Sequence, residues 1–139
     1  MIIDANCLGK FLQEPPNEDS QPIHTWMQKR GKLVYATEGK FSEEIGKEAR
    51  ERLDEYSDAG IARFVDKDTL SKELRTINKR IMKSDDEHVI ALAKAANVKL
   101  LYTHDRNLMD DFKNSHLIQD GKVYSGKRNK NFLRPDTCP

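Results

Sequence analysis

Four short apolar runs, each followed by a segment whose apolar residues recur every three or four positions, constrain the fold most. The apolar runs occupy residues 1–3, 32–36, 61–65 and 98–102. The helical spacing is clearest in Phe41, Ile45, Ala49 and Leu53. Strands that alternate with helices predict an α/β sandwich with a mainly parallel sheet. In such sheets, sites form outside the carboxyl ends of the strands, where the strand order reverses.

The same pattern predicts individual helices. A long helix is expected over roughly 40–56, where the apolar spacing is sustained. A second amphipathic helix is defined by Leu70, Leu74, Ile77 and Ile81. Ser84 is followed three residues later by Glu87, which matches a capping box and predicts that a helix opens there.

Length and composition bound the domain organisation. The chain has 139 residues, which suits one domain with a sizeable core. Although 34% of the residues are charged, the net charge is only +1 and the apolar residues are well patterned, so a folded domain is expected. Cys7 and Cys138 lack the spacing of a zinc site or a disulfide framework. No signal peptide and no apolar run of about 18 residues is found, so a cytoplasmic location without membrane contact is expected.

The C-terminal part of the chain differs in charge and in pattern. Residues 1–70 carry 10 Lys/Arg and 14 Asp/Glu, whereas residues 71–139 carry 14 Lys/Arg and 9 Asp/Glu. Residues 117–124 are expected to form a hairpin around Asp120 and Gly121. Beyond the domain, residues 125–139 are expected to form a basic, mostly irregular tail. Such a tail can contact phosphate, and a merely solvated tail is an equally good interpretation.

Acidic residues stand at or near the ends of the predicted strands. Asp4 directly follows the first strand, and Asp105 closely follows the fourth. Glu44 lies in the helix after the second strand, and Asp86 lies in the first turn of the helix before the fourth. If the first and fourth strands are neighbours, Asp4 and Asp105 meet at one edge of the sheet. Clustered carboxylates raise each other's pKa, and all-oxygen ligands suit Mg²⁺ or Mn²⁺, so a divalent metal site is one interpretation.

Each of these acids also has a purely structural interpretation. An aspartate after a strand is common as a turn former or helix cap. Asp85, Asp86 and Glu87 can be ordinary acids of a first helical turn, favoured by the helix dipole. Glu43 and Glu44 can belong to a solvated helix face. The pattern of four acids at strand ends is therefore stronger than any single member.

Two segments resemble the motifs of the PIN-domain family. I-I-D-A-N-C-L (2–8) is similar to the opening PIN motif, with an apolar strand, an Asp and a small polar residue two positions on. S-D-D-E-H-V-I-A-L-A-K-A-A-N-V-K-L-L-Y-T-H-D-R-N-L (84–108) is similar to the later motif and is the more specific part. The resemblance covers residues 1 to about 117. It implies a three-layer α/β/α fold with a central parallel sheet, in a PIN-like nuclease domain over residues 1–124.

The resemblance also implies a set of site residues. It identifies Asp4, Asp86 and Asp105 as metal-binding acids, together with Glu43 or Glu44, of which Glu44 is preferred because it lies near the buried side. Further positions are the competing acids Asp85 and Glu87 and the supporting residues Asn6 and Thr103. Many family members have another acid two residues after the last motif Asp, where this chain has Asn107, which puts a second metal in doubt. The histidines His24, His88 and His116 show no metal-ligand spacing with one another.

The function implied by the resemblance is a Mg²⁺- or Mn²⁺-dependent endoribonuclease that hydrolyses RNA phosphodiester bonds. Asp4, Glu44, Asp86 and Asp105 would be both the metal-binding and the catalytic acids. Phosphate contacts are expected from Arg106, Lys127, Arg128 and Lys130. One variant of this function is the toxin of a toxin–antitoxin pair, whose partner is an antitoxin protein. The alternatives are a PIN-like fold that binds RNA or a protein without cutting, and a generic α/β domain in which the acids are caps. PIN domains often dimerise, so a homodimer is a further expectation.

Overall fold

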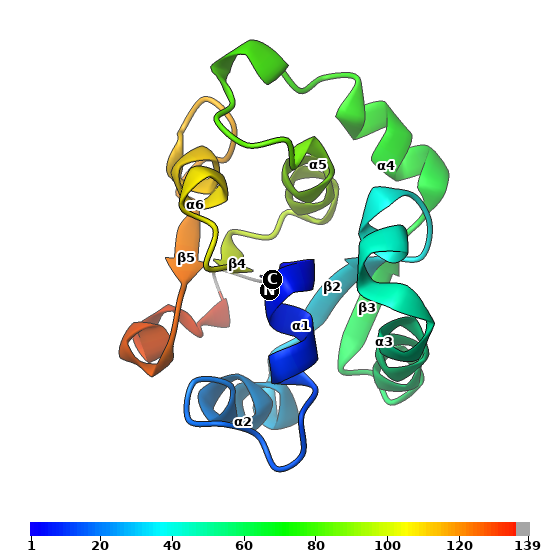
Figure 1. The fold of residues 1–139 in the computed structure, drawn as a ribbon, viewed down its shortest axis with the longest axis vertical. Helices are drawn as coiled ribbons and strands as arrows, with labels where there is room; N and C mark the ends of the chain where they lie inside the picture. The colour runs from blue at the N-terminus through cyan, green and yellow to red at the C-terminus, as the bar shows by residue number, and fades with distance from the viewer. Residues whose placement is uncertain (136–139) are drawn as a thin grey trace.

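The computed structural model describes residues 1–135 and has an α/β fold. The strands are β1 (Ile2–Ile3), β2 (Leu33–Ala36), β3 (Ala62–Val65), β4 (Leu100–Tyr102) and β5 (Lys122–Tyr124). The α-helices are α1 (Ala5–Phe11), α2 (Gln21–Lys29), α3 (Lys40–Asp58), α4 (Lys67–Leu74), α5 (Glu87–Ala96) and α6 (Arg106–Lys113). Two 3₁₀ helices, η1 and η2, span Lys79–Ile81 and Lys127–Phe132. Helices lie on both sides of the central strands, which gives the three-layer α/β/α arrangement that was predicted (Figure 1).

The strands pair only in parallel, and β1 stands beside β4. The ladders run in the orders β1-β4-β5 and β2-β3. Two backbone contacts join β1 to β2, since the Val34 amide donates to the Met1 carbonyl over 2.8 Å and the N-terminal amine donates to the Lys32 carbonyl over 2.7 Å. The combined order is therefore β3-β2-β1-β4-β5. The order reverses between β1 and β4, the position where ligands bind in parallel α/β sheets.

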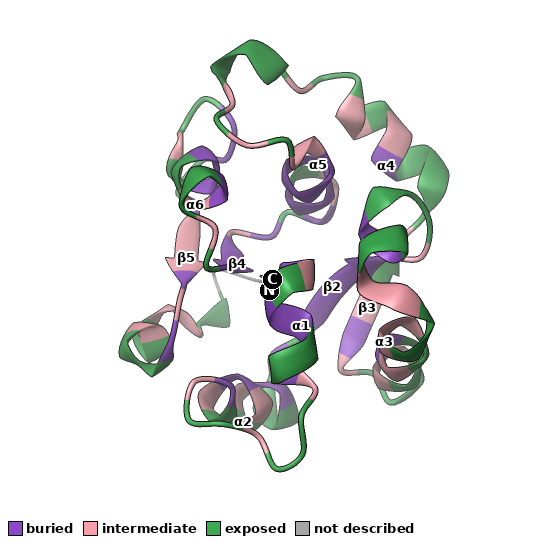
Figure 2. Ribbon diagram, viewed as in Figure 1, coloured by how far each residue is buried: buried purple, intermediate pink, exposed green. Residues whose placement is uncertain are grey.

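The centre of the core is formed by the central strands and the helix α5, and buried residues of α1, α2, α3 and α6 pack around it. β1, β2 and β4 are buried along their whole length, which explains why their sequences are continuous apolar runs. In α5, the run from Val89 to Ala93 is at most 1% exposed. Figure 2 shows this burial as a purple band through the centre of the molecule, with exposed residues on the outer helices. The core thus holds the start of α5 rigidly against the end of the sheet.

The predicted hairpin at residues 117–124 is wrong. Strand β5 pairs in parallel with β4, in the register Leu100 to Lys122, because α6 carries the chain back to the opposite end of the sheet before β5 begins. Leu117 and Ile118 are buried in a turn, where both amides donate to the carbonyl of Asn114 over 2.9 Å. The expected turn at Asp120 is present, with a positive φ of 57°.

Three helix predictions need correction. Residue Gly46, with φ 82° and ψ 170°, interrupts α3 by a kink that a residue with a side chain would adopt only with strain. Helix α4 stops at Leu74, and the hydroxyl of Thr76 donates to the Glu73 carbonyl over 2.7 Å, a local contact that competes with helix continuation. Ile81 consequently lies in η1 and is 39% exposed. The capping box at Ser84 does not form, because α5 begins at Glu87.

The start of the basic tail is ordered on the domain. Its residues Lys127–Phe132 form η2, so the described part of the tail is less irregular than predicted. The Tyr124 hydroxyl donates to the Asp19 carbonyl, and the Lys127 amide donates to the Asp19 carboxylate over 2.9 Å. Cys138 and the end of the tail lie outside the described residues. In residues 1–135, no helix combines the length and the apolar character that crossing a membrane requires.

Candidate metal centre at the carboxyl edge of the sheet

Pairing of β1 with β4 brings the two strand-end aspartates to one edge. The Asp4 amide continues the ladder by donating to the Tyr102 carbonyl over 2.9 Å. The buried Thr103 hydroxyl donates to the Asp4 carboxylate over 2.8 Å and accepts from the Asp105 amide over 3.1 Å. Thr103 therefore fixes both aspartates relative to each other, which is a supporting contact of the kind expected for it.

Asp105 is a helix cap as well as a candidate ligand. It occupies the N-cap of α6, where one carboxylate oxygen accepts from the amides of Asn107 over 2.9 Å and Leu108 over 3.2 Å. Both cap bonds end on Oδ1. The capping interpretation is thus correct for this residue, and the second oxygen, Oδ2, takes no part in the cap.

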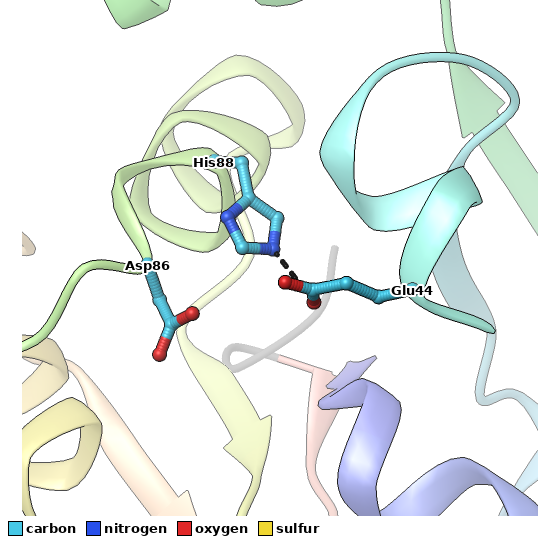
Figure 3. A group of neighbouring side chains, drawn as sticks. All are labelled: Glu44, Asp86 and His88. Carbon is cyan, nitrogen blue, oxygen red and sulfur yellow. Dashed lines mark ion pairs between the residues drawn. The ribbon is translucent and has the colours of Figure 1, made fainter.

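The second group of candidate ligands comes from α3 and the start of α5. Glu44, Asp86 and His88 each offer one ligand atom, and these atoms all lie within 4.8 Å of one another. His88 Nε2 lies 3.4 Å from Glu44 Oε2. Figure 3 shows Glu44 reaching from α3 toward the imidazole ring, with the Asp86 carboxylate beside them. The structure therefore brings Glu44 and Asp86 together as predicted and adds a histidine.

The electrostatics link this group to the strand-end aspartates. Burial, together with the negative charges of Asp4, Glu44 and Asp105, raises the pKa of Asp86 from 3.8 to about 6. The pKa of Asp4, which is 5% exposed, is likewise raised, chiefly by burial and further by Asp105 and Glu44. Opposing these effects are the Thr103 hydrogen bond at Asp4 and the Lys40 charge near Asp86. The negative charges of Glu44 and Asp105 thus act on both Asp4 and Asp86.

His88 is the residue of this site that the sequence did not identify. Its side chain comes from the first turn of α5, and the residue is only 5% exposed. Burial lowers the pKa of His88, against the opposing effect of Glu44, so the imidazole is neutral at neutral pH. Neither ring nitrogen finds a hydrogen-bond partner among residues 1–135. The signal in the sequence was its position two residues after Asp86, not a spacing to other histidines.

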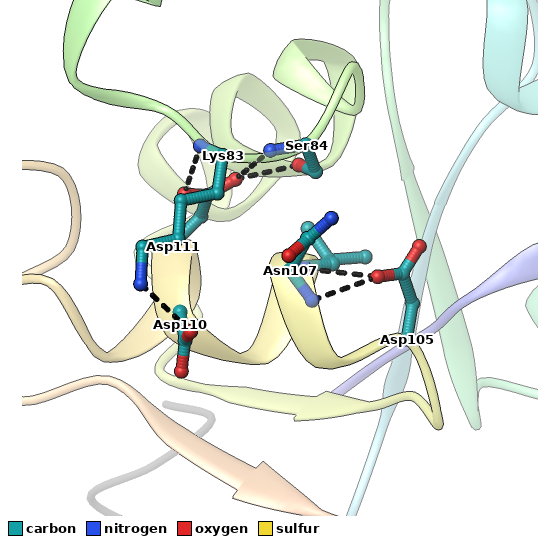
Figure 4. A network of polar contacts seen from close by, with 7 residues as sticks. Lys83, Ser84, Asp105, Asn107, Asp110 and Asp111 are labelled. Carbon is teal, nitrogen blue, oxygen red and sulfur yellow. Dashed lines mark hydrogen bonds and ion pairs between the residues drawn. The ribbon is translucent and has the colours of Figure 1, made fainter.

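A buried carboxylate holds the loop that carries Asp86. Asp111 of α6 is 1% exposed and accepts from the Lys83 amide over 2.7 Å and the Ser84 amide over 2.9 Å. The Ser84 hydroxyl also donates to Asp111, over 2.6 Å. Figure 4 shows this network beside the Asp105 cap. Ser84 is therefore used to anchor the loop to α6 and is lost to the predicted capping box.

The competing acids Asp85, Glu87 and Glu43 lie outside the group of ligand atoms formed by Glu44, Asp86 and His88. Asp85 is exposed, and it is its backbone carbonyl that accepts from Lys40 Nζ over 2.8 Å. Glu87 forms an ion pair with Lys79 at 3.5 Å. Glu43 and the predicted supporting residue Asn6 are exposed, but so is Glu44, so the expectation that Glu44 lies near the buried side is wrong. The cluster of ligand atoms thus contains Glu44 and Asp86 and leaves out their sequence neighbours.

The predicted phosphate-binding residues are exposed and belong to the same edge. Arg106 follows Asp105 at the start of α6. The tail residues follow the carboxyl end of β5, and the His104 ring, beside Asp105, contacts the Ser125 carbonyl over 2.9 Å. Lys127 is already paired with Glu18 over 3.2 Å, whereas Arg128 donates to Ser125 over 3.2 Å. A groove of about 520 Å³ next to the tail is lined by the basic residues Lys113, Lys122 and Arg128.

A second hollow, of about 270 Å³, is lined in part by His88, Leu70 and Leu74. Its charged lining is mixed: Lys40, Lys67 and Lys79 line it together with Glu38 and Glu87. Glu38 pairs with Lys67 at 3.8 Å and Glu87 pairs with Lys79 at 3.5 Å, so the hollow has little net positive charge.

Comparisons with family models, curated proteins and solved structures find no match to this chain. The resemblance to PIN domains therefore rests on the motifs alone and stays a prediction. What the fold and the site define is an α/β/α domain with an acidic cluster at the switch point of a parallel sheet.

Proposed function

We propose that the chain is a PIN-like, Mg²⁺- or Mn²⁺-dependent endoribonuclease. The observation that carries the proposal is that carboxylates from separate elements converge on Asp86, with a Glu44 oxygen within 4.8 Å of an Asp86 oxygen. Asp4, Glu44 and Asp105 all act to raise the pKa of Asp86, to about 6. A fold gains nothing by gathering like charges in a half-buried place, so such a cluster calls for a cation as its partner.

The donor set fits a divalent cation. Asp4, Glu44, Asp86 and Asp105 provide carboxylate oxygens, which are the ligands that Mg²⁺ and Mn²⁺ prefer. Asp4 is held by Thr103 and Asp105 by its cap bonds, so these two ligands are oriented before a cation binds. When bound, the cation would activate water for attack on a phosphodiester and stabilise the charge on the leaving oxygen.

The chain's own residues supply what the reaction needs besides the cation. Carboxylates of the cluster that do not hold the cation can orient the attacking water and accept its proton. Exposed cations at the same edge, including Arg106, Arg128 and Lys130, can hold the phosphates of a substrate strand. The preference for RNA over DNA is supported only by the resemblance.

The biological setting is proposed on the same basis. A toxin with an antitoxin partner, a cytoplasmic location and a homodimer all follow from the resemblance to PIN domains. The proposal of catalysis, rather than RNA binding alone, is supported by the retention of all four acids in the sequence, since loss of one ligand is the simplest route to an inactive domain.

The test is cleavage of a labelled single-stranded RNA by the purified full chain, with Mn²⁺, Mg²⁺ or EDTA. Asp105→Asn is the informative variant, because asparagine keeps the α6 cap and removes only the negative charge. We expect metal-dependent cleavage by the wild type and at least a hundredfold loss in the variant. Metal-independent cleavage, or full activity of Asp105→Asn, would contradict the proposal. An EDTA-treated sample with metal restored controls for damage by the chelator.

A further inference from the structure

We propose that His88 is a nitrogen ligand of the metal, so that the site binds Mn²⁺ in preference to Mg²⁺ through Glu44, Asp86 and His88. The inference rests on the proposed metal centre and goes beyond the four-carboxylate set implied by the motifs. It concerns a residue of this chain that the motifs do not identify.

The first observation is that His88 is buried and unsatisfied. The residue is 5% exposed, and both Nδ1 and Nε2 lack a hydrogen-bond partner within the described chain. A buried polar group without a partner costs about 1–3 kcal/mol of stability, so such groups are rare unless they have a function. A cation placed among the ligand atoms would satisfy one of these nitrogens.

The second observation is geometric. For bonds of about 2.1 Å, octahedral ligand atoms lie about 3 Å apart at neighbouring corners and about 4.2 Å apart at opposite corners. The approach of 3.4 Å between His88 Nε2 and Glu44 Oε2 is close to the separation of neighbouring ligands. The ligand atoms of Glu44, Asp86 and His88 all lie within 4.8 Å of one another. Small side-chain rotations would bring the three atoms onto one cation.

The alternative role for His88 is to hold Glu44 without touching the metal. His88 Nε2 and Glu44 Oε2 lie 3.4 Å apart, yet His88 Nε2 forms no hydrogen bond within residues 1–135. Holding Glu44 would be served by a well-formed hydrogen bond. Figure 3 shows the ring turning Nε2 toward the Glu44 carboxylate, with the Asp86 carboxylate nearby.

A nitrogen ligand changes which metal is preferred. Mg²⁺ takes oxygen ligands and gives up its waters reluctantly, whereas imidazole binds readily to transition metals. Mn²⁺ accepts both carboxylate oxygen and imidazole nitrogen. A mixed site therefore discriminates by ligand type, and removal of the imidazole should weaken Mn²⁺ binding while leaving Mg²⁺ binding nearly unchanged.

The experiment measures the metal's ligands directly, independently of RNA cleavage. The full chain is loaded with Mn²⁺, and electron spin echo spectroscopy tests for a directly bound nitrogen. Labelling only the histidines with ¹⁵N assigns that nitrogen without any substitution. Titration calorimetry with Mn²⁺ and with Mg²⁺ compares the wild type with His88→Gln and with the control His104→Gln, which alters the exposed histidine beside Asp105.

We expect a histidine nitrogen signal in the wild type and in His104→Gln, and its loss in His88→Gln. The preference for Mn²⁺ over Mg²⁺ should fall about tenfold in His88→Gln alone. Binding of Mn²⁺ without a nitrogen signal would overturn this inference and leave the nuclease proposal standing, as would a signal that disappears in His104→Gln. Failure of the wild type to bind Mn²⁺ or Mg²⁺ would overturn the inference and the proposed function together. If His88→Gln does not fold, the histidine signal of the labelled wild type and its persistence in labelled His104→Gln still decide.

Discussion

The first turns of α4 and α5 have the same N-cap residue in opposite environments. Asp66 precedes α4 and accepts from the Thr69 amide and from the Thr69 hydroxyl, both over 2.8 Å. These bonds lower its pKa. Asp86 precedes α5, makes no cap bond to that helix within the described residues, and has its pKa raised to about 6 by burial and by neighbouring acids.

This difference shows that an aspartate acting as a helix cap and an aspartate acting as a metal ligand can be distinguished only by their surroundings. Asp66 follows a strand and opens a helix, just as Asp105 does, and is an ordinary helix cap. Asp86 stabilises no helix end by its side chain and is instead surrounded by like charge. An N-cap aspartate that makes no cap bond and lies next to a buried histidine is the arrangement expected of a metal ligand. Asp105 lies between these cases, because it caps α6 and also faces Asp4.

The largest effect that tests this difference is expected when Asp86 and Asp66 are each replaced by asparagine. Asp86→Asn should lower metal-dependent RNA cleavage at least a hundredfold, because it removes one charged ligand from the cluster. Asp66→Asn should leave cleavage within twofold of the wild type and lower the melting temperature, because its carboxylate serves only the helix end. Single-turnover cleavage rates and thermal unfolding check both. Equal losses of activity in the two variants would contradict the distinction between Asp86 as a ligand and Asp66 as a helix cap.

A smaller effect is expected at the residue that holds the Asp86 loop. Asp111→Asn should lower the free energy of unfolding by about 2 kcal/mol, because an amide cannot accept from both the Lys83 and Ser84 amides and the Ser84 hydroxyl. It should also weaken Mn²⁺ binding severalfold by loosening the loop. The matched control is the exposed neighbour Asp110, whose ion pair with Lys83 adds little. Denaturant unfolding and calorimetry check the prediction, which fails if Asp110→Asn has the larger effect.

Much of the fold could be predicted from the sequence, because buried parallel strands are continuous apolar runs and helices repeat their apolar residues. The parallel β5 could not, since its short segment 122–124 carries no sign of its partner and Asp120 resembles a hairpin turn. The early end of α4 depends on a local contact of Thr76, which competes with an otherwise helical pattern.

The site could be predicted in part for a similar reason. Strand-end acids such as Asp4 and Asp105 are positioned by the sheet, so the order of strands is enough to bring them together. His88 and Asp111 could not be identified in this way. His88 stands in an apolar helix start like a core residue, and Asp111 looks like one of the surface acids of α6, yet it is 1% exposed. Their roles depend on burial and on partners distant in the sequence.

In the metal-free protein, the contributions of Asp86 and Asp66 to stability should depend on pH with opposite signs. The pKa of Asp86 is raised, so its neutral form favours folding; this contribution is complete below pH 3.8 and is lost as the pH rises through about 6. Metal-free Asp86→Asn should therefore exceed the wild type in stability at pH 7.5 by on the order of 1 kcal/mol, after allowance for solvent screening, and the gap should close toward pH 4. Asp66 has a lowered pKa, so its contribution is present above pH 3.8 and Asp66→Asn should be less stable at pH 7.5. Denaturant unfolding in EDTA across this range checks both signs.

The smallest effect is expected at Asp85, the nearest neighbour of Asp86. Asp85 is exposed, and its contact with Lys40 uses the backbone carbonyl, so Asp85→Asn leaves that bond intact. Its carboxylate is absent from the group of Glu44, Asp86 and His88. Cleavage rate and Mn²⁺ affinity should stay within about twofold of the wild type, since an exposed charge near a cation is largely screened. A loss at Asp85 as large as that at Asp86 would mean that the negative charge of the loop attracts the metal, whatever the position of each carboxylate. A loss at Asp86 alone would mean that the ligand is selected by where its oxygen points.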